Sequence, residues 1–116
     1  FQVKIDPSNG FIDQHIYATK TYEPDILQVM TEHLRPGDTF VDIGCNIGWH
    51  SLFAATLVGP NGRVFAFEPI PRLRNQFLES LAANSLGSRV TLSPFGCSDR
   101  AEEVAIHIKP HNIGVK

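Results

Sequence analysis

This sequence of 116 residues has little cysteine, no long apolar run and no excess of positive charge. Two cysteines, Cys45 and Cys97, are too few for a disulfide framework, which favours a reducing compartment. No apolar stretch approaches the roughly 18 residues of a membrane span, and the first residues lack the basic and apolar regions of a signal peptide. Ten Lys and Arg residues against 12 Asp and Glu residues give a net charge of −2, without the basic footprint of a nucleic-acid or membrane binder. We therefore expect a cytoplasmic protein with no membrane and no nucleic-acid partner.

The rest of the composition is that of one ordinary globular domain. Hydrophobic residues make up 42% and charged residues 19% of the chain, which excludes a disordered or collagen-like polypeptide. The length leaves room for one modest domain, and no internal repeat or interdomain linker is visible. The histidines show no spacing typical of a metal site, so no metal ligand is predicted.

Residues 1–23 are predicted to form an N-terminal hairpin or extended arm. Val3 and Ile5 alternate with polar neighbours, as in a half-buried strand. Residues 7–10, Pro-Ser-Asn-Gly, have the composition of a turn, and the segment from Phe11 to Tyr17 is predicted to return as a second strand. The remainder, residues 24–116, is expected to be one half of a larger domain, truncated after residue 116.

From residue 24 onward, helix and strand patterns alternate. Pro24 and Pro71 suit the first turn of a helix, and Gly87 suits a helix stop. Short apolar runs between the helices are typical of buried parallel strands. The predicted elements are a helix from Pro24, a strand over 39–43, a helix over 49–58, a strand over 63–67, a helix from Pro71 and a strand over 89–92.

This alternation predicts an α/β fold, a partial Rossmann-like doubly wound parallel sheet with strand order 3-2-1 and flanking helices. Val104, Ile106 and Ile108 recur at every second position, which predicts an extra peripheral β-strand. Two steps of about 4.8 Å across the sheet would separate Cys45 from Cys97, too far for a disulfide. The unpaired edge of the first strand would favour self-association or poor solubility.

The loop after the first strand carries residues suited to bind a ligand. In open parallel sheets, ligands bind beyond the carboxyl ends of the strands, where glycine lets the backbone approach them closely. Gly44 removes a side chain at that position, and Gly48 allows the helix start to pack tightly. Asn46 is one of the few non-glycine residues that tolerate left-handed backbone.

Two carboxylates distinguish this loop from a dinucleotide site. Glu68 ends the second predicted strand, precedes Pro69, and can accept both hydroxyl protons of an adenosine ribose. It is expected to lie in an open cleft and to contribute little to folding. Asp42 stands at the mouth of the loop, where it would repel a pyrophosphate. It suits a positively charged ligand such as S-adenosylmethionine, which favours methyl transfer over hydride transfer.

At these residues the sequence resembles the class I S-adenosylmethionine-dependent methyltransferases, and within them the FkbM family. Residues 40–48, FVDIGCNIG, resemble the first motif of the family, in which asparagine commonly replaces the middle glycine; Cys45 stands where alanine is usual. Residues 64–69, VFAFEP, resemble the second motif, and residues 81–86, LAANSL, resemble the end of its second helix. The resemblance covers residues 22–99.

The resemblance implies which residues hold the cofactor. The loop residues would line the methionine part of S-adenosylmethionine, and Glu68 would bind the ribose. Ser98 and Asp99 would contact the adenine, although a polar turn explains them as well. Tyr22 and Glu23 would lie over the cofactor, although a plain helix-entry segment explains them as well. The candidate cofactor-binding residues are Tyr22, Glu23, Asp42, Gly44, Cys45, Asn46, Gly48, Glu68, Pro69, Ser98 and Asp99.

The resemblance also implies O-methylation of a hydroxyl group, with a small-molecule or carbohydrate acceptor such as a sugar. Family members continue through four further strands that carry much of the acceptor site. No catalytic residue is therefore named, and the fragment is expected to be inactive alone. Two alternatives stay open, a NAD-dependent oxidoreductase fragment and a non-catalytic binding or interaction module. His50 and Ser51 are expected to be an exposed pair in the first turn of a helix.

Overall fold

Residues 1–96 are described by the structure, a computed structural model, and they belong to two structural units. Of the described residues, 1–4 and 23–96 belong to the larger unit and 5–22 belong to the smaller unit. In the described part of the chain, no helix has the length and apolar character needed to span a membrane.

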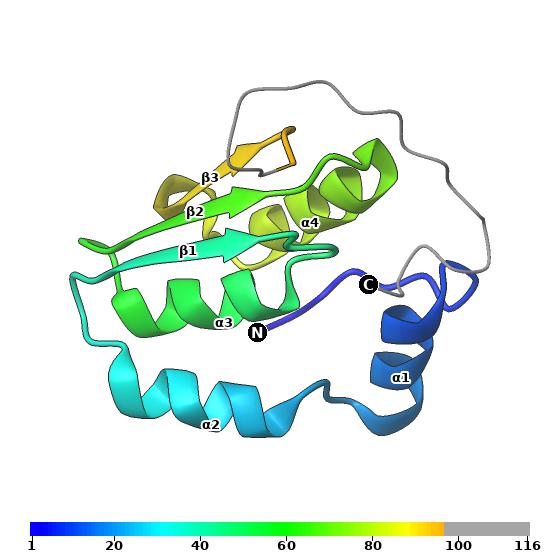
Figure 1. Cartoon of the computed structure of the whole chain (residues 1–116), viewed down its shortest axis with the longest axis horizontal. Coiled ribbons are helices and arrows are strands. Elements are labelled where there is room, and N and C mark those ends of the chain that lie inside the picture. Colours follow the sequence, from blue (N-terminus) through cyan, green and yellow to red (C-terminus); the bar gives the residue numbers. More distant parts are fainter. Residues whose placement is uncertain (97–116) are drawn as a thin grey trace. The chain divides into compact units, whose positions relative to one another are not determined.

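Three parallel strands form the sheet of the larger unit (Figure 1). They are β1 (Thr39–Ile43), β2 (Arg63–Phe67) and β3 (Val90–Ser93), paired in the order β1-β2-β3. Asp42 lies opposite Ala66, and Ala66 lies opposite Leu92. The predicted parallel sheet and its 3-2-1 order are confirmed, and the carboxyl ends of the strands lie at the same end of the sheet.

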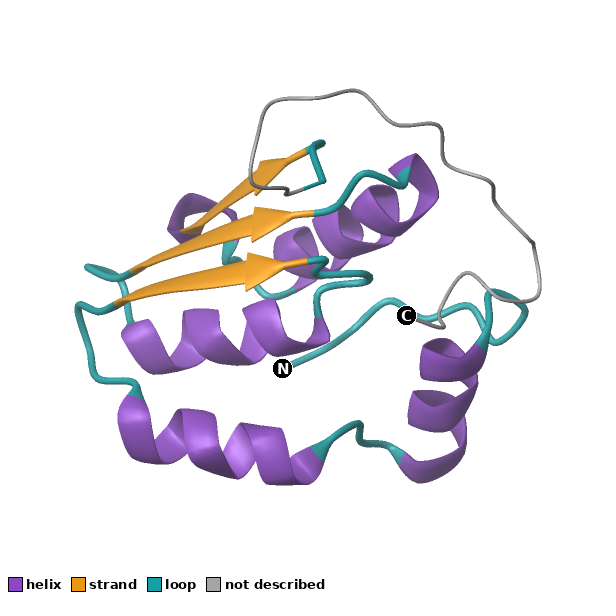
Figure 2. Cartoon of the chain, in the orientation of Figure 1, coloured by secondary structure: helices purple, strands orange, loops and turns teal. Residues whose placement is uncertain are grey.

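The helices of the larger unit follow the predicted alternation with the strands (Figure 2). They are α2 (Pro24–His33), α3 (Trp49–Val58), α4 (Pro71–Ala83) and the short 3-10 helix η1 (Gly87–Arg89). Proline opens α2 and α4, because its fixed φ suits the first helical turn and its missing N–H would have no partner there.

The hydrophobic core lies between the sheet and these helices. Val64 and Ala66 of β2 are fully buried, and they belong to one cluster with Leu52 of α3 and Phe77 of α4. Met30 of α2 belongs to the same cluster. The three α-helices of the larger unit therefore share a single core with one face of the sheet.

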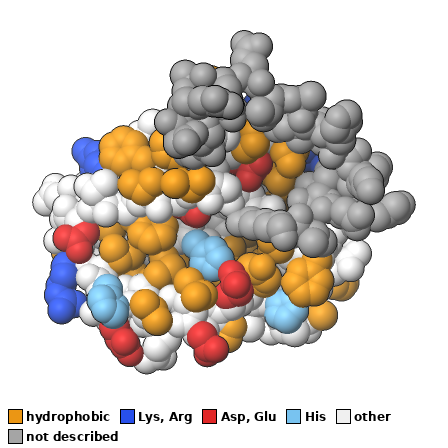
Figure 3. Space-filling model, viewed as in Figure 1, with side chains coloured by type: hydrophobic (Ala, Val, Ile, Leu, Met, Phe, Trp, Pro, Cys, Tyr) orange, Lys and Arg blue, Asp and Glu red, His pale blue; other side chains and the backbone are white. Residues whose placement is uncertain are grey.

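The opposite face of the sheet is exposed. Val41 and Ile43 of β1 expose 54% and 63% of their surface, and Phe65 of β2 exposes 39%. Successive residues of a strand point to opposite faces, so these side chains point away from the helical core. In Figure 3, hydrophobic side chains accordingly gather over the strands. Within the described part of the larger unit, helices cover only one face of this sheet.

The smaller unit contains a helix at the position of the predicted return strand. This helix, α1 (Phe11–Thr19), shows that the hairpin prediction is wrong. Ile12 and Ile16 lie one helical turn apart and are both buried, a spacing that suits a helix. The buried Asp13 carboxylate accepts a hydrogen bond from the Asp6 backbone N–H at 2.7 Å. The segment before α1 is therefore held by a side chain from the first turn of this helix and not by a partner strand.

Other predictions for the terminal regions have different outcomes. The predicted arm at residues 1–23 is divided between the units, because residues 1–4 belong to the larger one. The predicted peripheral strand at residues 104–108 lies outside the described residues, as do Ser98 and Asp99. These assignments stay predictions.

Candidate functional site

The loop at residues 44–48 connects β1 to α3 at the carboxyl end of the sheet. Three of its residues have positive φ, namely Gly44 at 71°, Asn46 at 57° and Gly48 at 93°. The Gly44 backbone N–H donates to the carbonyl of Phe67, the last residue of β2, at 2.8 Å. Glycine and asparagine tolerate left-handed backbone, so the expected turn chemistry of the loop is confirmed.

Two glycines of this loop face different surroundings. A Cβ on Gly48 would lie 2.2 Å from Cδ1 of Phe77 in α4. The Phe77 ring is fully buried, so any side chain at residue 48 would clash with the core. A Cβ on Gly44 would meet no described atom within 4 Å. The described residues therefore leave the start of the loop uncrowded, while its end is tightly packed.

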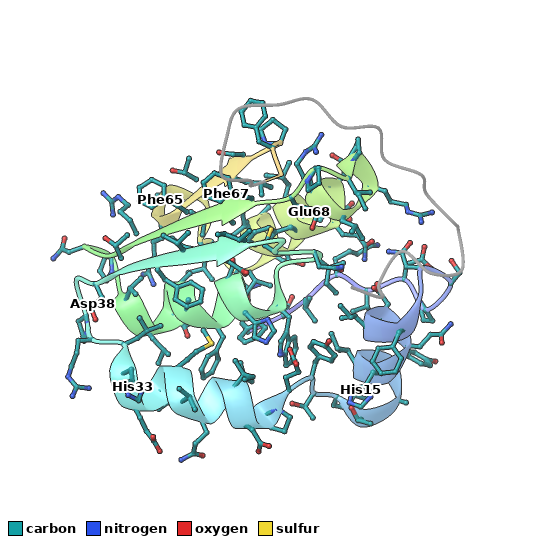
Figure 4. All side chains as sticks on the ribbon, in the orientation of Figure 1. His15, His33, Asp38, Phe65, Phe67 and Glu68 are labelled. Carbon is teal, nitrogen blue, oxygen red and sulfur yellow. The ribbon has the colours of Figure 1, made fainter. Side chains whose placement is uncertain are left out.

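Glu68 follows β2 (Figure 4) and is hydrogen-bonded to the 44–48 loop. Its Oε1 accepts a hydrogen bond from the Asn46 backbone N–H at 2.8 Å, and its Oε2 accepts one from the Ile70 N–H at 3.1 Å. Only 4% of the residue is exposed. The expectation of an open strand-end carboxylate is therefore wrong, because two backbone segments close around the side chain.

The Glu68 carboxylate keeps acceptor capacity for a ligand. A carboxylate has about four acceptor positions, two on each oxygen. Among the described residues, Oε1 and Oε2 each accept one backbone hydrogen bond. By count, two acceptor positions are left, which is the number that two neighbouring hydroxyl groups would fill, and a ligand would reach them only through the 4% of the residue that is exposed. Sequence reasoning missed Arg74, whose Nη1 donates to the Glu68 carbonyl oxygen at 2.9 Å.

Asp42 is joined to the first turn of α3. The Ser51 hydroxyl donates to Asp42 Oδ2 at 2.7 Å, and Ser51 is fully buried. The expectation of an exposed pair at residues 50 and 51 is thus wrong, because Ser51 is fully buried and His50 is half-buried. A small polar residue in a mostly apolar helix was the only sequence signal for this contact.

Glu23 reaches the same turn of α3 from the start of α2. Its Oε1 lies 3.2 Å from Nε2 of His50, whose side chain is 18% exposed. Tyr22 belongs to the smaller unit, in which its ring lies edge-on to the His15 ring with centroids 5.8 Å apart. The structure brings Glu23 to the helix that follows the loop, and a cofactor role for Tyr22 or for the half-buried Pro69 stays a prediction.

The described site contains no arranged set of metal ligands. Within residues 1–96, no group of three or more His, Cys, Asp and Glu side chains could hold a metal ion. Cys45 is buried in the loop as a thiol, and Cys97 lies outside the described residues. The chemistry offered by these residues is hydrogen bonding and negative charge, from Glu68 and Asp42.

No family model matches the chain, but curated relatives do. A protein-L-isoaspartate O-methyltransferase from Triticum aestivum is 31% identical over 103 residues, which cover 81% of this chain and 42% of the relative. Further curated relatives carry the same name. The chain spans less than half of the length of these relatives.

Solved structures share the fold described above. A protein assigned as an rRNA methylase from Clostridium thermocellum is 34% identical with a TM-score of 0.61, covering 63% of this chain and 39% of that one. An S-adenosylmethionine-dependent O-methyltransferase from Thermotoga maritima is 26% identical with a TM-score of 0.58, covering 70% and 32%. Relatives and solved structures together indicate a class I S-adenosylmethionine-dependent methyltransferase. The predicted class is confirmed, whereas these matches do not show the FkbM family.

The curated relatives and solved structures correct the predicted acceptor. Their names refer to protein isoaspartate and to rRNA. The expectation of a small-molecule or carbohydrate acceptor, with no nucleic acid, is therefore wrong. The acceptor expectation came from the FkbM resemblance, whereas the exclusion of nucleic acid came from the net charge, which averages over the whole surface and does not report the charge at one binding site.

Proposed function

We propose that this methyltransferase binds S-adenosylmethionine at the 44–48 loop and Glu68 and transfers its methyl group to an oxygen atom of a macromolecule. The O-methyltransferase names of the curated relatives support oxygen as the accepting atom. The same names support a protein carboxylate, as in an isoaspartyl residue, as the first candidate acceptor. The activity is proposed for the whole protein, because the chain spans less than half of these relatives.

The hydrogen bond between Glu68 and the Asn46 N–H is the observation that carries this proposal. Through this bond, a carboxylate with two acceptor positions left by count lies next to a loop in which a Cβ on Gly44 would meet no described atom within 4 Å. A ribose diol needs two neighbouring acceptors in a fixed orientation, because hydrogen bonds weaken steeply with misalignment. A carboxylate held by two backbone N–H groups meets both needs.

Asp42 suits the positively charged end of the cofactor. The Ser51 hydroxyl orients its carboxylate by donating to Oδ2 at 2.7 Å. Asp42 is half-buried between β1 and α3, and a partly buried charge attracts an opposite charge more strongly than one in bulk water does. The ammonium and sulfonium groups of S-adenosylmethionine are the proposed partners.

The proposed reaction demands positioning more than proton transfer. Bound S-adenosylmethionine supplies an electrophilic methyl group on a sulfonium. In-line placement of the attacking oxygen and this methyl group is the main requirement. A carboxylate acceptor is already ionised near neutral pH, since the usual pKa of Asp is about 4, and it needs no general base. The residues of this chain therefore contribute binding and orientation.

RNA is a second candidate acceptor, favoured by the 34% identity to the Clostridium thermocellum protein.

The finer FkbM-type assignment rests on residues alone. Asn46 occupies the position of the middle glycine in the first motif, and Glu68 with Pro69 matches the second. The FkbM assignment concerns the subfamily of this methyltransferase and leaves the choice between a protein and an RNA acceptor to experiment.

Calorimetric titration of the full-length protein with S-adenosylhomocysteine and with NAD tests the cofactor. Binding of S-adenosylhomocysteine alone is the expected result. Binding of NAD alone would instead indicate an oxidoreductase, and binding of neither would indicate a non-catalytic module.

Transfer of a labelled methyl group from S-adenosylmethionine tests the acceptor. An isoaspartyl peptide is compared with the otherwise identical aspartyl peptide, and an rRNA fragment with DNA of the same sequence. We expect label on the isoaspartyl peptide and none on its aspartyl control. Label on rRNA alone would favour the second acceptor, and label on neither would exclude both.

A further inference from the structure

The first four residues, Phe1–Lys4, are held against α4 through their main chain; we call them the N-terminal strap. Asn84, at the end of α4, contacts both main-chain groups of Gln2. Its Oδ1 accepts a hydrogen bond from the Gln2 N–H at 2.7 Å, and its Nδ2 donates to the Gln2 carbonyl at 2.5 Å. A primary amide is well suited to this pairing because it offers one donor and one acceptor side by side.

Two further side chains of α4 bind the main chain of Lys4 in the same way. Ser80 Oγ accepts a hydrogen bond from the Lys4 N–H at 2.6 Å, and Gln76 Nε2 donates to the Lys4 carbonyl at 3.2 Å. Residues four apart on a helix are separated by about 6 Å along its axis, and alternate residues of an extended chain by about 6.6 Å. Because these spacings match, one face of α4 can bind alternate residues of a segment that runs beside it.

The strap contacts α3 through a side chain. The Phe1 ring lies edge-on to the Trp49 ring with centroids 5.1 Å apart, and its centroid is 6.2 Å from that of Phe53. These distances lie in the range of favourable aromatic pairs. Val3 packs against the main core cluster. Four residues therefore connect two helices, α4 through main-chain bonds and α3 through aromatic packing.

These contacts meet at the end of the 44–48 loop. Trp49 directly follows Gly48, and Gly48 lies against Phe77 of α4 without space for a Cβ. The middle of the loop is bonded to Glu68. A small movement of the first turn of α3 relative to α4 would therefore displace the loop, because tight packing leaves no room to absorb it.

We propose that the N-terminal strap is a positioning element for the 44–48 loop. It pins the first turn of α3 to α4 and thereby holds the loop in the conformation that binds the cofactor. The inference rests on the proposed function for the role of the loop. Asn84, Ser80 and Gln76 bind only the main chain of the strap, so Phe1 is the strap residue whose side chain acts on α3.

Two variants of the full-length protein, Phe1→Ala and Asn84→Leu, test the inference. Asn75→Leu is the matched control, because Asn75 lies on an exposed part of α4. A second control, Val58→Ala, weakens the core at the far end of α3 without touching the strap. The measurements are the Kd for S-adenosylhomocysteine, the free energy of unfolding, and amide hydrogen exchange in the first turn of α3.

We expect Phe1→Ala and Asn84→Leu to raise the Kd roughly three- to thirtyfold, the range for residues coupled to a site without touching its ligand. Amide exchange at Leu52, whose N–H donates to the Gly48 carbonyl at 2.8 Å, should become faster. Asn75→Leu should change neither the Kd nor the amide exchange at Leu52. Val58→Ala should lower the free energy of unfolding while leaving the Kd within about twofold.

If the strap stabilised the fold without positioning the 44–48 loop, the measurements would give a different result. Both strap variants would then lower the free energy of unfolding while the Kd and the exchange at Leu52 stay at wild-type values, and the inference would be wrong. If the wild-type protein does not bind S-adenosylhomocysteine at all, the proposed function fails, and the exchange at Leu52 decides the inference by itself. Faster exchange in both variants then supports the strap as a positioning element, and unchanged exchange overturns it.

Discussion

Glu68 connects the end of β2 to the neighbouring loop at the scale of a single side chain. Its two oxygens accept hydrogen bonds from the backbone N–H groups of Asn46 and Ile70. A hydrogen bond to a charged group contributes about 1.5–3 kcal/mol, and a buried donor left without its partner costs about 1–3 kcal/mol. The residue therefore serves folding as well as the proposed cofactor binding.

Replacing Glu68 by glutamine should lower the free energy of unfolding by about 1–3 kcal/mol. Glutamine has one side-chain oxygen, so its NH2 group must face either the Asn46 or the Ile70 N–H, donor against donor. Urea denaturation measures the loss, with the exposed Glu79→Gln as a control that should stay within about 0.5 kcal/mol of wild type. A Glu68→Gln protein as stable as wild type would contradict this account of the two bonds.

The same residue should control cofactor affinity. Glu68→Ala removes two charge-assisted acceptors and should weaken S-adenosylhomocysteine binding roughly thirty- to a thousandfold in the full-length protein. Titration is done at a temperature at which thermal melting shows the variant to be folded. Unchanged affinity in a folded variant would exclude Glu68 from the ribose site.

At the scale of elements, the junction of the 44–48 loop with α3 lies against α4 with no space for a side chain. Gly48→Ala should lower the free energy of unfolding by about 2–5 kcal/mol. Left-handed backbone costs an alanine about 1–2 kcal/mol, and overpacking against the Phe77 ring costs about 1–3 kcal/mol. Residue 44 also has positive φ, but a Cβ there would meet no described atom within 4 Å, so Gly44→Ala should show the backbone cost alone.

Urea denaturation of both glycine variants separates the two costs. Equal losses would mean that the Phe77 ring does not constrain residue 48. Adding Phe77→Leu to Gly48→Ala should show a favourable coupling between the two sites in a double-mutant cycle, because the smaller side chain makes room for the new methyl group.

At the scale of the whole molecule, the described sheet has one covered face and one exposed face. Truncating a valine on each face, in neighbouring strands, tests this difference. Val64→Ala, at a fully buried position of β2, should lower the free energy of unfolding by about 2 kcal/mol. Val41→Ala, at a position of β1 that is 54% exposed, should change it by about 0.5 kcal/mol or less. A loss at Val41 as large as that at Val64 would show that this face is covered in solution.

The sequence by itself determined the order of the elements and the place of the site. Pro24 and Pro71 mark helix starts, and the apolar runs at residues 39–43 and 63–67 mark the first two parallel strands. These features are local, because backbone preference and side-chain period act over a few residues. The position of Glu68 at a strand end also follows from this local pattern.

Only the tertiary structure decided which groups these residues contact. The bond from Asn84 to Gln2 joins residues 82 positions apart, and the bond from Asn46 to Glu68 joins residues 22 apart. No local pattern encodes such pairs, since they depend on how the helices and strands pack together. Helix α1 was also decided by the tertiary structure. The apolar spacing at residues 11–17 fits a helix or a strand, and the burial of both Ile12 and Ile16 favours the helix. The Glu68 carboxylate, predicted to be open, is therefore buried and hydrogen-bonded because packing brings residues distant in the sequence together.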